Sequence, residues 1–244
     1  MNTEYFKTTA SGLVVLAIGI LLAALIGGSF YLRGRAYENT LSVTGSAKME
    51  VKADTGKWSF DLVRKIKFTD QKLGYAEIAS DIKTSKDFLI KSGLKAEDIT
   101  VTPAQFSVDY DKQQIQGVEP DYQLRTRITV NSKDVALLSA VTDRVPELVS
   151  EGVYISNTSV EYFYSGLPDA RVKLSGEAIK DAKNRAESIA AASGSHAGKL
   201  QSVSGGVIQV LPPNSTDVSD YGTYDTSTID KVISLSVRAA FTTK

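Results

Sequence analysis

The chain contains no cysteine and only one histidine, His196, among its 244 residues. The absence of cysteine excludes disulfides, thiolate metal sites and a cysteine nucleophile, and it is compatible with an oxidising compartment such as a periplasm. With a single histidine, a zinc site would need carboxylates for most of its ligands. A glycine-rich phosphate-binding loop is also missing from the sequence. We therefore predict no metal and no cofactor.

The chain also lacks an excess of charge of either sign, because 28 basic side chains balance 28 acidic ones. A nucleic-acid-binding protein would need a basic excess to neutralise phosphates, so this class of partner is not expected. Hydrophobic residues make up 42% of the chain, which is enough for a folded core. The composition thus indicates a globular protein of one domain or two small ones.

The single histidine lies in a segment where it could serve either as a catalytic base or as part of a helix end. A catalytic interpretation would pair His196 with the hydroxyl of Ser193 or Ser195. Near neighbours in a turn rarely reach hydrogen-bonding distance together with a third residue that orients the base. The glycines at 194 and 198 instead favour the end of a helix. We predict no catalytic residues.

One long run without charge stands near the N-terminus, from Thr8 to Leu32. A bilayer core needs about 20 apolar residues, and this run is long enough to cross it. We predict a short flank over residues 1–8, a transmembrane anchor over 9–32 and a polar linker over 33–40. A cleaved signal peptide is the alternative, but its apolar core would be shorter, about 7–15 residues.

The orientation of this anchor is not decided by the charges that flank it. Lys7 stands on one side, and Arg33 and Arg35 stand on the other. Read literally, the positive-inside rule favours a cytoplasmic module, but only by about one charge.

Small residues recur every fourth position within the run, at Gly19, Ala23 and Gly27. This spacing lets transmembrane helices approach closely, so the three residues are candidates for helix packing in the membrane. The alternative is that glycine and alanine are simply common in membrane helices.

Hydrophobic periodicity in the soluble part predicts an α+β fold. Alternating segments predict strands over residues 41–52, 57–68, 99–110, 122–130, 153–163, 200–211 and 232–241. Helical spacing predicts helices over 70–93, 132–145 and 169–192, the last rich in alanine so that another element can pack close to it. From Trp58 to Phe163 the order is β-α-β-β-α-β, as in a ferredoxin-like split β-α-β unit. The first and last strands, with the long helix, would form a flanking second sheet.

A polar loop over residues 212–230 separates the last two strands. It carries four aspartates, but they lack the spacing of a calcium-binding loop, so a solvated acidic loop is the better interpretation. Tyr221 and Tyr224 lie in the same loop and are candidates for contact with a partner.

The segment Leu41–Phe60 resembles the opening of the SIMPL-domain family, also known as DUF541. It contains V-T-G ending at Gly45, then V-x-x-D ending at Asp54, and then an alternating strand that includes Trp58. Further agreement comes from Gly93-Leu94 with Ile99-Thr100, from the segment 178–190 with Gly194 and 198–200, and from the closing segment 232–241. Together these segments follow the order of the family over residues 41–244.

The resemblance implies an exported bacterial envelope protein with no established enzymatic activity and no catalytic residues to transfer. It also implies self-assembly, since some relatives build ring-like homo-oligomers, and roles in stress tolerance have been suggested. From it we expect a single-pass protein of the bacterial inner membrane with its soluble domain in the periplasm. The 212–230 loop looks individual to this chain, so ligand or partner binding by that loop is the alternative function.

Overall fold

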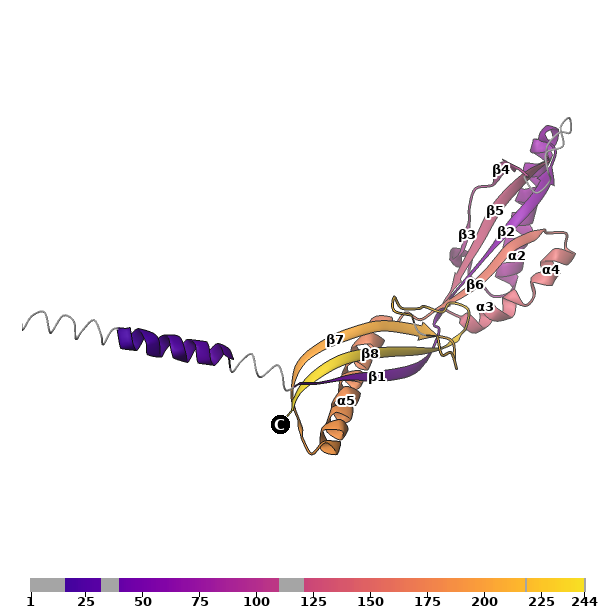
Figure 1. Cartoon of the computed structure of the whole chain (residues 1–244). Coiled ribbons are helices and arrows are strands. Elements are labelled where there is room, and N and C mark those ends of the chain that lie inside the picture. Colours follow the sequence, from indigo (N-terminus) through magenta and orange to yellow (C-terminus); the bar gives the residue numbers. More distant parts are fainter. Residues whose placement is uncertain (1–15, 32–39, 110–120, 218, 244) are drawn as a thin grey trace, which may run out of the picture. The chain divides into compact units, whose positions relative to one another are not determined.

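The computed structural model describes residues 16–31, 40–109, 121–217 and 219–243 (Figure 1). It confirms the α+β prediction, with two separate sheets and several helices. The strands are β1 (Thr40–Lys52), β2 (Thr55–Ile66), β3 (Ile99–Val101), β4 (Gln105–Val108), β5 (Tyr122–Ser132), β6 (Ile155–Phe163), β7 (Ala197–Leu211) and β8 (Asp230–Thr243). The helices are a first one over residues 16–31, then α2 (Gln71–Lys91), α3 (Val135–Thr142), α4 (Val145–Ser150) and α5 (Leu167–Ala192).

The chain divides into two compact units, which are described separately. The first unit contains residues 1–47, 173–207 and 235–244, and the second contains residues 48–172 and 208–234. Each unit is therefore built from segments that are distant in the sequence.

The second unit is built on an antiparallel sheet with the order β3-β5-β2-β6, to which β4 adds by pairing with β5. Both β2 and β3 run antiparallel to β5, so they are parallel to each other with β5 between them. The element order along this unit is β2-α2-β3-β4-β5-α3-α4-β6, which follows the predicted β-α-β-β-α-β order with one additional strand and one additional helix.

The core of this unit lies between one face of the sheet and the helices α2, α3 and α4. Trp58, Phe60 and Leu62 of β2 are fully buried in it. Side chains alternate between the two faces of a strand, so the same alternation sends Ser59 and Asp61 to the opposite, open face. Antiparallel sheets often keep one face toward water, and this one does so with polar residues.

Two prolines shape the elements more strongly than the sequence pattern predicts. The single strand expected over residues 99–110 is interrupted around Pro103, which lacks the N–H needed for the ladder, and becomes β3 and β4. The helix expected to end near Pro146 stops at Thr142, and a separate helix α4 begins with this proline in its first turn.

The first unit packs α5 against β1 and β8 of the sheet β1-β8-β7 (Figure 1). The contact is made by small residues, since Ala178, Ala182 and Ala186 are fully buried against Val43 and Phe241. This confirms the expectation that another element packs close to the alanine-rich helix. β1 runs without interruption through Gly45, and this glycine lies directly beneath α5.

The helix over residues 16–31 is described, but the predicted anchor over 9–32 extends past it at both ends. Residues 9–15 and 32 lie outside the described part of the chain. Among the helices that the structure describes, none is both long enough and apolar enough to cross a membrane.

Candidate functional site

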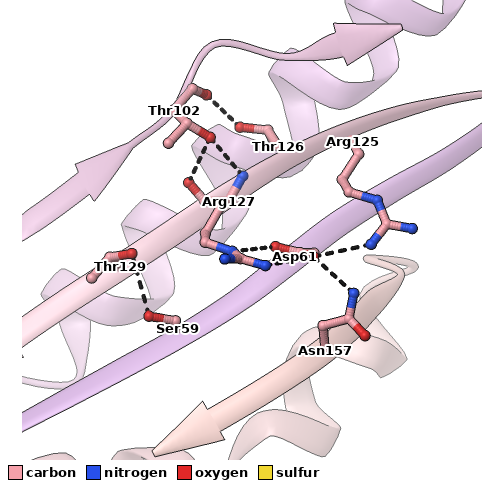
Figure 2. Close-up of polar contacts among 8 residues, drawn as sticks. All are labelled: Ser59, Asp61, Thr102, Arg125, Thr126, Arg127, Thr129 and Asn157. Carbon is pink, nitrogen blue, oxygen red and sulfur yellow. Dashed lines mark hydrogen bonds and ion pairs between the residues drawn. The ribbon is translucent and has the colours of Figure 1, made fainter. Parts of the chain in front are cut away.

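The open face of the five-stranded sheet carries a polar cluster centred on Asp61 (Figure 2). Asp61 lies in β2 directly opposite Arg127 of β5, and Arg125 lies two residues along β5. On the other side of β2, Asn157 of β6 points toward the same carboxylate. Three strands therefore each contribute to one small site.

Four hydrogen bonds converge on the Asp61 carboxylate. Arg127 donates from Nε to Oδ1 at 2.7 Å and from Nη2 to Oδ2 at 3.2 Å. Arg125 donates from Nη1 to Oδ2 at 3.1 Å. Asn157 donates from Nδ2 to the same oxygen at 2.9 Å. With Asp61 only 1% exposed, this full set of donors is what allows a charge to remain buried.

Asn157 reaches the cluster because the backbone of β6 is irregular at this point. The pairing of β2 with β6 shifts register between Ser59 and Asp61, and Asn157 has a φ of 47°. Asparagine tolerates this left-handed conformation better than most residues. The irregularity thus redirects one side chain toward the buried carboxylate.

The environment holds Asp61 in its ionised form. Burial by itself raises the pKa of this carboxyl, but the hydrogen bonds from Arg127, Asn157 and Arg125 outweigh burial and bring the pKa below its ordinary value. A general base needs a pKa near the working pH and a free lone pair. The lowered pKa of Asp61 does not meet the first requirement, and its carboxylate instead orients two guanidinium groups.

Those two guanidinium groups face solvent. The side chains of Arg127 and Arg125 are 53% and 38% exposed, whereas that of Asp61 is 1% exposed. Two cations against one carboxylate leave one excess positive charge on this face. An oriented, exposed arginine pair is suited to bind a carboxylate or phosphate group of a partner.

A second polar cluster holds the loop between β7 and β8. The side chain of Lys231 is fully buried, and its Nζ donates to the backbone oxygen of Asp225 at 2.6 Å and contacts its Oδ2 at 3.1 Å. The Asp225 carboxylate also accepts hydrogen bonds from the backbone and hydroxyl groups of Ser227 and Thr228. Burial raises the pKa of Asp225, but these donors outweigh it and leave the pKa well below its usual range.

This loop is fixed at several further points. Gln209 is buried, and its side-chain amide donates to the carbonyl oxygen of Ser219 at 2.9 Å and accepts from the Ser219 N–H at 3.3 Å. Val210 forms a parallel bridge with Tyr224, and Gly222 has the positive φ of 86° that its turn requires. These contacts anchor the backbone of the loop at Ser219 and at Tyr224.

The two tyrosines predicted as partner contacts occupy different positions in the loop. Tyr221 is 96% exposed, so almost its whole ring stands in solvent. Tyr224 is 38% exposed and packs near Phe163, and its Oη accepts a hydrogen bond from the backbone N–H of Tyr164 at 2.9 Å. Tyr221 is available to a partner, whereas Tyr224 ties the loop to the end of the sheet.

The family model described as SIMPL, protein of unknown function (DUF541), matches residues 41–240. The chain belongs to the SIMPL family. No curated protein matches it. The description of the SIMPL family states no function, so the family sets the fold context of the two clusters without assigning them a role.

The structure of this SIMPL chain also describes other residues that were candidates from the sequence. Ser193 to His196 follow the end of α5, where Gly194 has a φ of 73° and the Ser193 hydroxyl donates to the carbonyl of Ala190. Gly19 and Gly27 lie on the first helix with open space where a Cβ would be. Within the described residues, no group of three or more histidines, aspartates or glutamates is close enough to hold a metal ion.

The Asp61 cluster was not predicted from the sequence. The sequence contains one indication of it, because Asp61 is an acidic residue between Phe60 and Leu62 in a strand whose alternation is typical of the core. Its partners, however, are 64 to 96 residues away along the chain. Only the strand order β5-β2-β6 brings them together.

Proposed function

We propose that this SIMPL-family chain is a non-enzymatic protein of the bacterial cell envelope. In this proposal residues 9–32 anchor it in the inner membrane, its soluble domain lies in the periplasm, and it works as a homo-oligomer. The observation that carries the proposal is the loop around Tyr221. A buried ion pair and a buried glutamine anchor this loop while the Tyr221 ring stays almost fully exposed.

An exposed aromatic side chain on an anchored loop is the kind of group that anchors protein interfaces. Tyrosine is enriched at interface hot spots because it buries a large area with few rotatable bonds. A loop that is already ordered loses little entropy when it docks. These features support a protein partner, and the family resemblance favours a second copy of the chain.

The proposal that the protein is not an enzyme is supported by two carboxylates that each accept several hydrogen bonds, Asp61 and Asp225. Asp61 and Asp225 both have lowered pKa values and have their oxygens occupied by fixed donors. Neither is poised to exchange a proton near neutral pH.

The membrane anchor is supported by the first helix. All its large apolar side chains are exposed, from 51% at Ile18 to 68% at Phe30. An apolar helical surface of this kind is stable in lipid or against another apolar surface.

Tyr221→Ser tests the oligomer. We expect the full-length protein, at micromolar concentration in mild detergent, to form a homo-oligomer, and the variant to lose most of it, because the serine removes the aromatic anchor. Native mass spectrometry measures both species. Ser202→Ala, an exposed change in β7, is the control that should keep the wild-type mass.

Two results would count against self-assembly. A monomeric wild-type protein would contradict it directly. A wild-type oligomer that is unchanged by Tyr221→Ser, together with loss of a co-purifying protein of a different mass, would favour the alternative in which the loop binds another partner.

An introduced cysteine tests the location. Because the chain has no cysteine of its own, Thr223→Cys gives a unique label site on an exposed loop residue. We expect a membrane-impermeant maleimide to label it once the outer membrane is permeabilised and before the inner membrane is lysed. Labelling only after inner-membrane lysis would place the domain in the cytoplasm instead.

A further inference from the structure

The second unit carries two surfaces of opposite charge. One is the arginine pair, defined as Arg125 and Arg127 on the open face of the sheet. The other is the loop tip, defined as Asp217, Asp220 and Tyr221. Both belong to the same compact unit, so every copy of the chain presents both.

The arginine pair has unused binding capacity. Arg127 uses its Nε and Nη2 on Asp61, and Arg125 uses its Nη1 on Asp61 and its Nη2 on Gln123. In the described part of the chain, the Nη1 group of Arg127 and the Nε group of Arg125 make no hydrogen bond. These groups remain available to a carboxylate, and a guanidinium plane also accepts an aromatic ring against it.

The loop tip has the matching chemistry. Asp217 and Asp220 are exposed, and neither pairs with a lysine or arginine among the described residues. Tyr221 stands beside Asp220 with its ring in solvent. Two unpaired carboxylates next to an aromatic ring form a group that complements two guanidinium groups.

Fixed contacts support both surfaces. Asp61, which also accepts a hydrogen bond from Asn157, orients the arginine pair, and Gln209 holds the backbone of Ser219 next to Asp220. Docking two preorganised surfaces requires little loss of side-chain freedom, so more of the interaction energy appears as affinity.

The two surfaces do not meet within one copy. The loop touches the end of the sheet where Thr55 pairs with Phe163. Arg127 and Arg125 pair with Asp61 and Val63, six and eight residues further along β2. At about 3.3 Å per residue this separation is roughly 20–26 Å. The partner for each surface must therefore come from another molecule.

We propose that, in the homo-oligomer, the loop tip of one copy docks on the arginine pair of the next copy. This inference rests on the self-assembly proposed above and names its interface. The contact joins two different surfaces, so it is heterologous, and its repetition gives a closed ring where the rotation between copies closes and an open filament where it does not. Because it depends on charge, the contact weakens as salt screens it.

Two triple variants of the full-length chain test the contact. The tip variant is Asp217→Asn, Asp220→Asn, Tyr221→Ser. The face variant is Asp61→Asn, Arg125→Gln, Arg127→Gln, which neutralises the whole cluster and leaves no buried carboxylate unpaired. Circular dichroism checks that both remain folded. Native mass spectrometry in mild detergent measures their mass separately and after mixing.

We expect each variant alone to be monomeric. Mixed at equal concentration, they should form a dimer and nothing larger, because the intact tip of the face variant fits the intact arginine pair of the tip variant. The controls are Lys57→Gln with Glu161→Gln, an ion pair elsewhere on the same sheet, and Asp230→Asn, an exposed carboxylate at the end of the loop. Both should assemble as the wild type does.

Other results would overturn the proposal at distinct points. A folded face variant that assembles like the wild type would remove the arginine pair from the interface while leaving self-assembly in place. Two monomeric variants that fail to form a dimer on mixing would exclude a heterologous contact. A monomeric wild type would overturn self-assembly itself, and this contact with it.

Discussion

Replacing Lys231 with alanine is expected to lower the free energy of unfolding by about 3–5 kcal/mol, the usual cost of removing one partner from a buried ion pair. The Lys231 side chain has no exposed surface, and its Nζ bonds both the backbone and the carboxylate of Asp225. Alanine would leave a cavity and an Asp225 carboxylate without its cation. Urea unfolding followed by circular dichroism measures the change.

Lys52→Ala is the matched control for this prediction. Lys52 also pairs with an aspartate of the loop, Asp230, at 3.6 Å, but its side chain is 80% exposed. Exposed pairs contribute about 0–1 kcal/mol, so this variant should remain close to the wild type. Equal effects at Lys231 and Lys52 would show that burial of the Lys231 pair does not contribute to stability.

The same cluster makes the free energy of unfolding depend on pH. The pKa of Asp225 is lower in the folded protein than its ordinary value of 3.8. A lowered carboxyl pKa contributes stability that is fully present above the unfolded pKa and is lost as the pH falls toward the folded pKa. Between pH 5 and pH 3 the wild type should therefore lose more stability than Asp225→Asn does.

Gly45→Ala is expected to destabilise the other unit by about 3 kcal/mol, the upper end of the range for overpacked cores. A Cβ at this position would overlap the backbone oxygen of Ala178 and the backbone nitrogen of Ala182, and would lie 2.7 Å from the Ala182 Cβ. Backbone atoms of α5 cannot rotate away as a side chain can. The helix would have to move off β1, which thermal unfolding would detect.

Gly176→Ala serves as the opposite control in the same helix. A Cβ at Gly176 would meet no atom within 4 Å. Alanine has a higher helix propensity than glycine, so this change should raise stability by about 0.5–1 kcal/mol. If both substitutions had the same sign, close packing of α5 on β1 would not be the reason for glycine at position 45.

Local patterns in the sequence were sufficient to predict most of the strands and helices, but not the points at which these elements are interrupted. Trp58, Phe60 and Leu62 alternate as a strand with one buried face, and they form the core as expected. Pro103 interrupts the strand expected over residues 99–110, and Pro146 begins a separate helix, α4, beyond the helix expected over 132–145. The energetic cost of a missing N–H is local, but whether the chain continues beyond it depends on what the next residues pack against.

For the predicted site residues too, the sequence indicated the candidates but not their environment in the fold. Tyr221 was chosen as a candidate because a tyrosine in an acidic, polar loop stands out in the sequence, and the structure shows that it is exposed. Its neighbour Tyr224 looked equivalent, but the fold turns it toward Phe163 and Tyr164. The exposure of a loop residue depends on how the loop folds back, and no local pattern encodes that.

The sequence by itself determined the α+β class, the family and the alanine-rich face of α5, because periodicity, turn residues and small side chains act over short stretches of chain. Only the tertiary structure decided that Asp61 is buried and ionised, that Arg125 and Arg127 form an exposed pair, and that Lys231 is buried. The reason is that a charge is stable in the interior only when specific donors surround it. Those donors come from strands and loops that meet only in the folded protein.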